Sequence, residues 1–243
     1  MTPQPARPCH AAGRLRSPGR VRIPWARLLA LVTGTVAMGS GVTLLLWARL
    51  GLIPLDVLHV GVAHMLGSTV GGGIIAVQAI ALLLYLPLRI RPGIGTIAAF
   101  VVPAAVVDVA LPRFPDLEGL GVRIGVFVFG ALVFCLGVAT YLATDLGRIP
   151  RDAIMVALAG KRRGAPPPPR RIACIRIGID IACVVTGALM LGPATTVRTG
   201  TLNIGSLALV CGCGPLIALL WHRMRRLPFF ARRQQTSPGE PPQ

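Results

Sequence analysis

The sequence predicts an all-α membrane protein of about six transmembrane helices, built as two three-helix repeats of inverted topology. Three observations lead to this prediction: an apolar composition, a series of long uncharged runs, and a motif that occurs twice. Hydrophobic residues make up 53% of the chain and charged residues 14%, with a mean hydropathy of +0.71. Soluble domains carry about a quarter of charged residues, so the composition excludes an ordinary soluble fold.

The apolar runs give the positions of the expected helices. Each approaches the roughly 20 residues that cross a bilayer as a helix, which is more than a buried core helix needs. The first run, 25–48, is too long for the hydrophobic region of a signal peptide and lacks a small-residue cleavage site, so we expect an uncleaved helix. The further expected spans are 70–88, 94–111, 122–143, 172–191 and 201–221. GVRIG (121–125) also fits the small-residue pattern of helix packing in membranes.

The remaining segments divide the chain into two halves with tails. Residues 1–24 are basic and Pro-rich without apolar periodicity, and we expect them to form a flexible tail. The other expected parts are a first repeat at 25–111, an extracytoplasmic loop at 112–121, a second repeat at 122–221 that contains a Pro/Arg-rich cytoplasmic loop at 144–171, and a basic tail at 222–243.

The distribution of basic residues predicts the orientation of these spans. With the N-terminus inside, the cytoplasmic segments hold 20 of the 25 Lys and Arg residues and the outer segments hold 4. Cytoplasmic loops carry the excess of Lys and Arg, so we expect both termini in the cytoplasm. The cations of KRRGAPPPPRR in the long loop fix this topology, or alternatively contact anionic lipid headgroups.

The composition also excludes several classes of function. A net charge of +17 is compatible with nucleic-acid binding, but aromatic residues for base stacking are only 5% of the chain. The basic residues lie between apolar runs, so we expect the lipid bilayer as partner and no nucleic acid. No Ser/His, HExxH or paired-Asp arrangement is present. We therefore expect no enzyme, no catalytic residue, no cofactor and no metal.

An internal repeat is the most informative feature of the sequence. GVTLLLWARLGLIPLD (41–56) matches GVATYLATDLGRIPRD (137–152) at eight of sixteen positions with a constant offset of 96. A second match, RPGIGT (91–96) with RTGT (198–201), pairs Gly95-Thr96 with Gly200-Thr201. Three spans in each half force the second copy to enter the membrane from the opposite side, as in the inverted repeats of secondary transporters.

The repeated motif Gly-x-x-Pro-x-Asp predicts a helix break followed by a restart. Glycine adopts the left-handed conformation that ends a helix, proline fits a first helical position, and aspartate in the first turn complements the helix dipole. The stretch 54–66 is about 20 Å long as a helix, too short to span, so we expect it to be interfacial or re-entrant. One interpretation is that the motif provides only the residues of a turn. The other is that the two helix restarts approach a central site. Its residues are Gly51, Pro54, Asp56, Gly147, Pro150 and Asp152.

Asp108, Arg176 and Asp180 lie inside expected spans, where an ionised group costs at least a few kcal/mol unless it is paired or hydrated. Arg176 and Asp180 are four residues apart on one helical face, which predicts an ion pair. Asp108 has no evident local partner and lies near the outer end of its span. A packing or topology role is one interpretation of these residues, and lining the path of a solute or ion is the other.

The motifs together carry a resemblance to a known family. A Gly-containing break with Pro-x-Asp occurs twice, Gly-Ile-Gly-Thr (93–96) opens the third span, and Arg176 precedes Asp180 by four residues. In these features the chain resembles the YczE/YyaS/YitT family of bacterial integral membrane proteins, most closely its YczE-like branch, over residues 30–221. Leu55 stands where that family usually has an aromatic residue, and the later Gly-Ile-Gly-Thr is reduced to TGTLNIG.

The resemblance implies a multi-pass protein of the bacterial cytoplasmic (inner) membrane and transfers no substrate or reaction, because the family is largely uncharacterised. Two functions fit the sequence. One is a transporter or permease-like protein for a small solute, favoured by the repeats, the broken helices and the charges within the membrane. The other is a non-transporting accessory protein that assists a biosynthetic or envelope assembly through a membrane protein partner.

Overall fold

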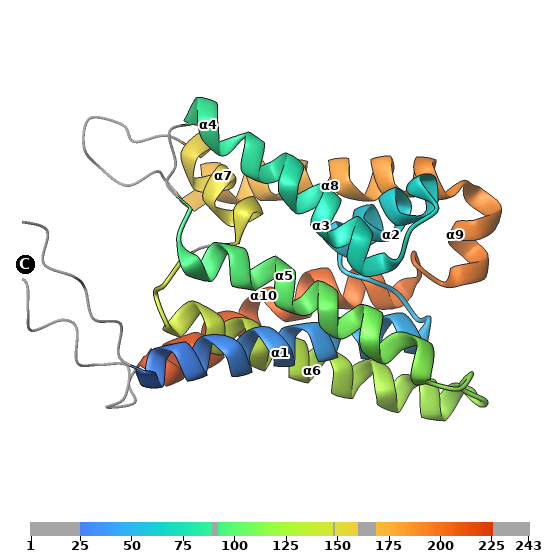
Figure 1. Cartoon of the computed structure of the whole chain (residues 1–243). Helices are drawn as coiled ribbons and strands as arrows, with labels where there is room; N and C mark the ends of the chain where they lie inside the picture. Colours follow the sequence, from blue (N-terminus) through green and yellow to red (C-terminus); the bar gives the residue numbers. More distant parts are fainter. Residues whose placement is uncertain (1–24, 89–91, 148, 160–168, 226–243) are drawn as a thin grey trace, which may run out of the picture.

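The computed structural model describes residues 25–88, 92–147, 149–159 and 169–225, and within these ranges the regular secondary structure is entirely helical (Figure 1). Among them, six helices are long and apolar enough to cross a membrane, which confirms that prediction. The inverted relation of the two halves stays a prediction. The long helices are α1 (Trp25–Ala48), α3 (Val70–Leu83) continued by α4 (Tyr85–Leu88), α5 (Ile94–Ala110), α6 (Leu120–Ala143), α8 (Pro169–Leu191) and α10 (Ile204–Arg225).

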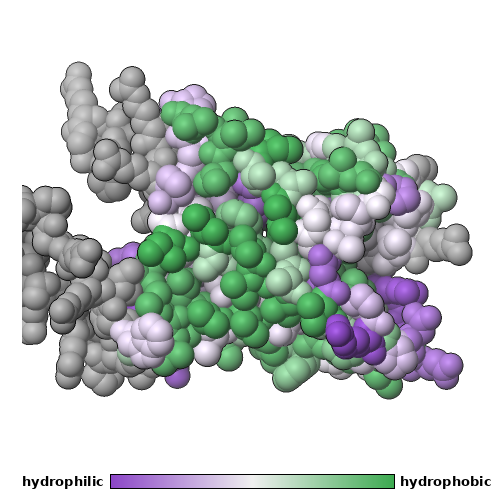
Figure 2. Space-filling model, viewed as in Figure 1, coloured by the Kyte–Doolittle hydropathy of each residue, from purple (hydrophilic) through white to green (hydrophobic). Residues whose placement is uncertain are grey.

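Short helices connect the long ones, and parts of the expected tails and loop lie outside the described residues. The short helices are α2 (Pro54–Leu66), η1 (Leu111–Arg113), α7 (Pro150–Ala159) and α9 (Pro193–Thr199). The tail at 1–24, the segment 160–168 of the long loop and the end of the chain from 226 are not described. Figure 2 shows apolar residues over the middle of the visible face and hydrophilic residues gathered at its right-hand end, as a lipid-facing belt requires.

The most extensive helix pair is α1 with α6, and glycines make its close packing feasible. Figure 1 shows the two helices side by side and running in opposite directions. A Cβ atom on Gly41 would lie 2.5 Å from the backbone nitrogen of Phe134, and one on Gly34 would lie 2.8 Å from that of Tyr141. Small residues at such crossings let helix backbones approach in lipid. Gly121 and Gly125, by contrast, have nothing within 4 Å of where a Cβ would stand, so GVRIG does not pack helices within this chain.

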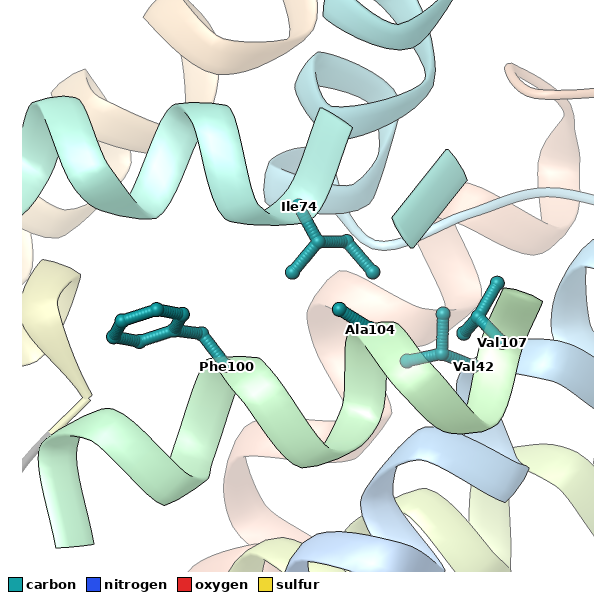
Figure 3. Close-up of a cluster of buried hydrophobic side chains, with 5 residues drawn as sticks. All are labelled: Val42, Ile74, Phe100, Ala104 and Val107. Atoms are coloured by element: carbon teal, nitrogen blue, oxygen red, sulfur yellow. The ribbon is translucent and has the colours of Figure 1, made fainter. Parts of the chain in front are cut away.

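The first half has its own apolar core between α1, α3 and α5. Val42, Ile74, Phe100, Ala104 and Val107 form one cluster in which none is more than 8% exposed. Figure 3 shows Ile74 reaching from α3 toward Ala104 of α5, with Val42 and Val107 beside it. The cluster packs α3 directly onto α5.

The short helix α2 lies inside the bundle. After α1 the chain turns back toward the middle of the molecule, and α2 then runs between α3 and α8 (Figure 1). Several residues of α2, including Asp56 and His59, are buried. Its 13 residues give a helix of about 20 Å, shorter than the roughly 30 Å of a hydrocarbon core. The short helix expected at 54–66 is confirmed, and its burial fits the re-entrant alternative.

Candidate functional site

Each half contains the predicted break before its short helix, but other residues than expected turn the chain. Arg49, after α1, has φ 52° and Asp145, after α6, has φ 56°. These left-handed residues stand 96 positions apart, as the repeat requires. Gly51 has φ 138°, and Gly147 is not among the residues with positive φ. The chain therefore turns at Arg49, directly after α1, and at Asp145, two residues after α6, and the two motif glycines have another role.

That role is close approach between the halves. A Cβ on Gly51 would collide with the backbone nitrogen of Ser206 and lie 2.8 Å from its Oγ. A Cβ on Gly147 would lie 2.6 Å from the backbone nitrogen of Thr96 and 2.8 Å from its Oγ1. Each break thus packs on the first turn of the last long helix of the other half, through matching atoms. Such reciprocal contacts are what two inverted repeats would make.

These contacts match the residues of the two halves differently from the sequence alignment before the last helix. Gly205-Ser206 at the start of α10 occupies the place that Gly95-Thr96 occupies at the start of α5. Sequence alignment pairs Gly95-Thr96 with Gly200-Thr201, but Gly200-Thr201 precedes α10. A Cβ on Gly200 (φ 64°) would collide with the carbonyl oxygen of Arg49, so this pair packs against the end of α1.

Asp56 and His59 form a buried polar pair in α2. The two residues are 8% and 4% exposed, and His59 Nδ1 lies 3.1 Å from Asp56 Oδ1. Asp56 Oδ2 and His59 Nε2 are buried and have no hydrogen-bond partner among the described residues. Both residues line a cavity of about 70 Å³ together with Gln78 of α3, which we call the inner cavity.

A network of ion pairs lies at the start of α7. Arg151 Nη1 is 3.0 Å from Asp180 Oδ1 of α8, and Arg151 Nε is 3.4 Å from Asp152 Oδ1. The predicted pair of Arg176 with Asp180 is present at 3.9 Å, so Arg151 is the closer partner of Asp180. The side chains of Arg151 and Asp180 are 18% and 16% exposed, whereas that of Arg176 is 46% exposed. The less exposed ion pair of the site is therefore Arg151 with Asp180, and both side chains are half-buried.

This network borders a second, larger cavity of about 330 Å³, which we call the outer cavity. It is lined by α8 through Arg176, Ile177 and Asp180, and by α10 through residues such as Val210. Ile177 and Val210 are 59% and 49% exposed, so the cavity opens toward the lipid-facing surface between α8 and α10. The residues common to both cavities are Ile53, Phe134, Ile149 and Arg151.

The two cavities meet where the short helices begin. Ile53 is the N-cap of α2 and makes no side-chain capping hydrogen bond, and α7 follows another isoleucine, Ile149. The first N–H groups of a helix have no partner within it and carry partial positive charge. One region thus holds two helix N-termini without side-chain caps, a half-buried ion pair and unpaired polar atoms.

Asp108 belongs to a different place. Its Oδ1 accepts a hydrogen bond from the Gly71 N–H at 2.8 Å, and its Oδ2 accepts one from the Thr69 hydroxyl at 2.8 Å. Thr69 in turn is the N-cap of α3 and accepts from the Gly72 N–H. The carboxylate therefore stabilises the start of α3, which is the partner that sequence reasoning did not find.

Sequence reasoning placed Asp56, Asp152 and Asp180 among the candidates and missed two of their partners. Arg151 was counted with the cations of the cytoplasmic loop, although it stands opposite Leu55 in the repeat. His59 lies three residues after Asp56, and this spacing along one helix is the sequence signal for their pair. The signal for Arg151 is its position next to Pro150, in the expected first turn of the helix that restarts after the break.

Comparisons with known proteins agree with this architecture. A model of a family of unknown function, DUF6198, matches residues 25–221. An uncharacterised protein of Haemophilus influenzae is 24% identical over 191 residues, covering 79% of this chain and 81% of the relative. An uncharacterised membrane protein, YczE of Bacillus subtilis, is 29% identical over 130 residues, covering 53% and 60%. No solved structure matches the chain. The expected resemblance to YczE-like membrane proteins is confirmed, and none of these names contains a substrate.

Proposed function

We propose that this chain, which belongs to the DUF6198 family of unknown function, is a permease-like protein that moves a small solute across the bacterial cytoplasmic membrane. The observation that carries the proposal is the convergence of α2 and α7, each too short to span, on a site with half-buried charges. Secondary transporters bind their cargo near the bilayer midplane at such interrupted helices. A charge held inside the membrane without function is an unnecessary cost.

The two cavities support a solute path that is divided by a barrier. Arg151 lines both cavities, and its partner Asp180 lines the outer one. In the proposed cycle, Arg151 leaves Asp180 to connect the cavities and returns to it to close the inner cavity again. A carrier needs such a barrier beside its binding site, because the site must face only one side of the membrane at a time.

The test is solute flux in vesicles that contain the purified protein. We expect uptake or efflux of at least one solute of a broad panel by the wild type, and loss of most of that flux in Asp180→Asn. Asp145→Asn is the matched control, because it makes the same chemical change at an exposed residue outside both cavities. Flux that is equal in Asp180→Asn and the wild type would exclude this site as the path.

The accessory role is the outcome that would replace the proposal. If no solute moves and the protein instead copurifies with an enzyme assembly, the permease function fails. Flux in the wild type that Asp145→Asn keeps and Asp180→Asn loses would exclude a purely accessory role.

We also propose that both termini are cytoplasmic. The excess of Lys and Arg in the expected inner segments supports this orientation, and Figure 1 draws the start of α1 and the end of α10 at the same end of the molecule. Arg151 contributes to the site and not to a loop, which leaves the excess large. A membrane-impermeant thiol reagent should label Lys161→Cys only from the cytoplasmic side, and labelling from outside would reverse the orientation.

A further inference from the structure

Two polar atoms of residues that line the inner cavity have no hydrogen-bond partner among the described residues. Asp56 Oδ2 and His59 Nε2 are both buried, both unpaired among the described residues, and both belong to side chains that line this cavity. Their residues are more than nine-tenths buried. A buried polar atom without a partner is costly, so a group inside the cavity completes the hydrogen bonding of both atoms.

These two atoms fit a donor group with more than one hydrogen. When the imidazole N–H at Nδ1 donates to Asp56 Oδ1, at the observed 3.1 Å, His59 Nε2 is left as an acceptor. Asp56 Oδ2 is an acceptor as well. An ammonium group has three donors and a positive charge, so it satisfies both atoms and balances the carboxylate.

Another part of the cavity lining fits an anion. Ile53, before α2, and Ile149, before α7, both line the cavity, and neither side chain can cap its helix. Helix N-termini attract anionic groups through their free N–H groups and their dipole. Both helices begin with a proline, which has no N–H, so the first backbone donor of α7 is the N–H of Arg151. Arg151 lines the same cavity and adds a guanidinium with five N–H donors, only part of which its two aspartate partners use.

The volume and the walls limit the ligand further. A water molecule needs about 10–15 Å³ of such space, so the 70 Å³ of the inner cavity holds a molecule of only a few non-hydrogen atoms. Met38, Val42 and Ile74 form an apolar wall. The ligand is therefore small, charged at both ends, and without a large polar side group.

We propose that the inner cavity binds a small zwitterion, with its carboxylate at Arg151 and the start of α7 and its ammonium group at Asp56 and His59 of α2. The proposal names the substrate class and so rests on the proposed function for its role, although binding itself can be measured alone. L-Alanine has both charges and a size that suits the cavity.

The experiment uses three probes that differ by one charged group each. Binding of L-alanine, propionate and ethylamine to the purified full-length protein in detergent is measured by isothermal titration calorimetry. We expect L-alanine to bind at least tenfold more tightly than either of the others. Asp56→Asn should weaken L-alanine binding at least tenfold and leave propionate binding unchanged, which also shows that the variant is folded. His64→Gln, an exposed residue on the same helix, is the matched control and should change nothing.

Three results would overturn the proposal. Propionate binding as tightly as L-alanine would indicate an anion site, ethylamine binding as tightly would indicate a cation site, and no binding of any probe would leave no zwitterion site. Vesicles that move another solute without L-alanine binding would contradict this inference and keep the permease. L-Alanine binding without any flux would keep this inference and contradict the permease.

Discussion

The two halves have the same order of long and short helices but differ in how their second and third spans pack. In the first half α3 lies directly on α5 through Ile74 and Ala104. In the second half, within the described residues, α8 and α10 make no comparable contact, and the outer cavity lies between them. In the most apolar 18-residue stretch of each span, 28% is buried for the span of α3 and 39% for that of α5. The corresponding shares are 17% for α8 and 6% for α10.

The halves also differ in polarity at matching places. Leu55 in the first turn of α2 corresponds to Arg151 in the first turn of α7. The half with Arg151 and its ion pairs is the open one, and the half with Leu55 at the matching position is the packed one. The comparison teaches that the half-buried ion pair of Arg151 with Asp180 lies where helix packing is incomplete. We therefore expect the second half to contain the moving parts and the first half to be the more rigid.

The largest expected difference between the two halves is in how readily a thiol reagent reaches a cysteine in each cavity. Ala173 and Ala99 line the outer and the inner cavity, respectively, and Ala99 is 5% exposed. In a background without native cysteines, we expect a small water-soluble methanethiosulfonate to modify Ala173→Cys completely and Ala99→Cys not at all within the same time. Mass spectrometry of the intact protein gives the modified fraction. Equal modification of both would remove the difference between the cavities.

The next effect concerns the ion pair. Asp180→Ala leaves the half-buried Arg151 with only Asp152 beside it, and we expect a loss of about 2 kcal/mol in the free energy of unfolding, less than the roughly 3–5 kcal/mol for a fully buried pair. Adding Arg151→Leu copies Leu55 of the first half and should recover most of that loss. Denaturant unfolding in micelles measures both. A double variant less stable than Asp180→Ala would show that Arg151 stabilises the fold without Asp180.

A smaller effect is expected at the motif glycines. Gly51→Ala and Gly147→Ala each place a Cβ against the first turn of a helix from the other half, and we expect about 1–3 kcal/mol of destabilisation. Gly51→Ala should cost more because its φ is positive. Gly178→Ala, with nothing within 4 Å, is the control and should be neutral or slightly stabilising. Thermal unfolding of the three variants compares them, and an unaffected Gly147→Ala would break the correspondence between the halves.

The smallest effect is expected at Asp108, the membrane carboxylate of the packed half. Asp108→Asn keeps an acceptor for the start of α3 and should cost about 1 kcal/mol or less. Solute flux per folded protein should stay unchanged, unlike in Asp180→Asn. A flux as low as that of Asp180→Asn would show that transport also depends on Asp108 in the first half.

Much of this fold follows from the sequence because hydrophobic length is a direct physical requirement of the bilayer. The six spans and the short helix at 54–66 were predicted within a few residues. The repeat located both helix breaks, but not which residues turn the chain, since Arg49 in a left-handed conformation has no sequence signal. Gly205-Ser206 was missed because NIGS differs from GIGT at two positions.

The site was harder to predict than the fold. Asp56, Asp152 and Asp180 follow from their position in a motif or span, whereas their partners depend on how helices from the two halves meet. Arg151 approaches Asp180 of α8, 29 residues away, only because α7 turns into the bundle. His59 and Asp56 are close along one helix, yet the missing partners of their outer atoms become visible only with the surrounding cavity.

The central claim is that the two short helices begin at one shared site, and a cross-link tests it most directly. Ile53 and Ile149 line the same two cavities from the starts of α2 and α7. In bacterial membranes, with native cysteines replaced, a short cleavable bis-thiol reagent should join Ile53→Cys to Ile149→Cys within one chain and stop solute flux until it is cleaved. Ile53→Cys paired with Val109→Cys, at the end of α5, should not be joined. Two cysteines that each react with a single-ended reagent but never become joined would contradict the claim.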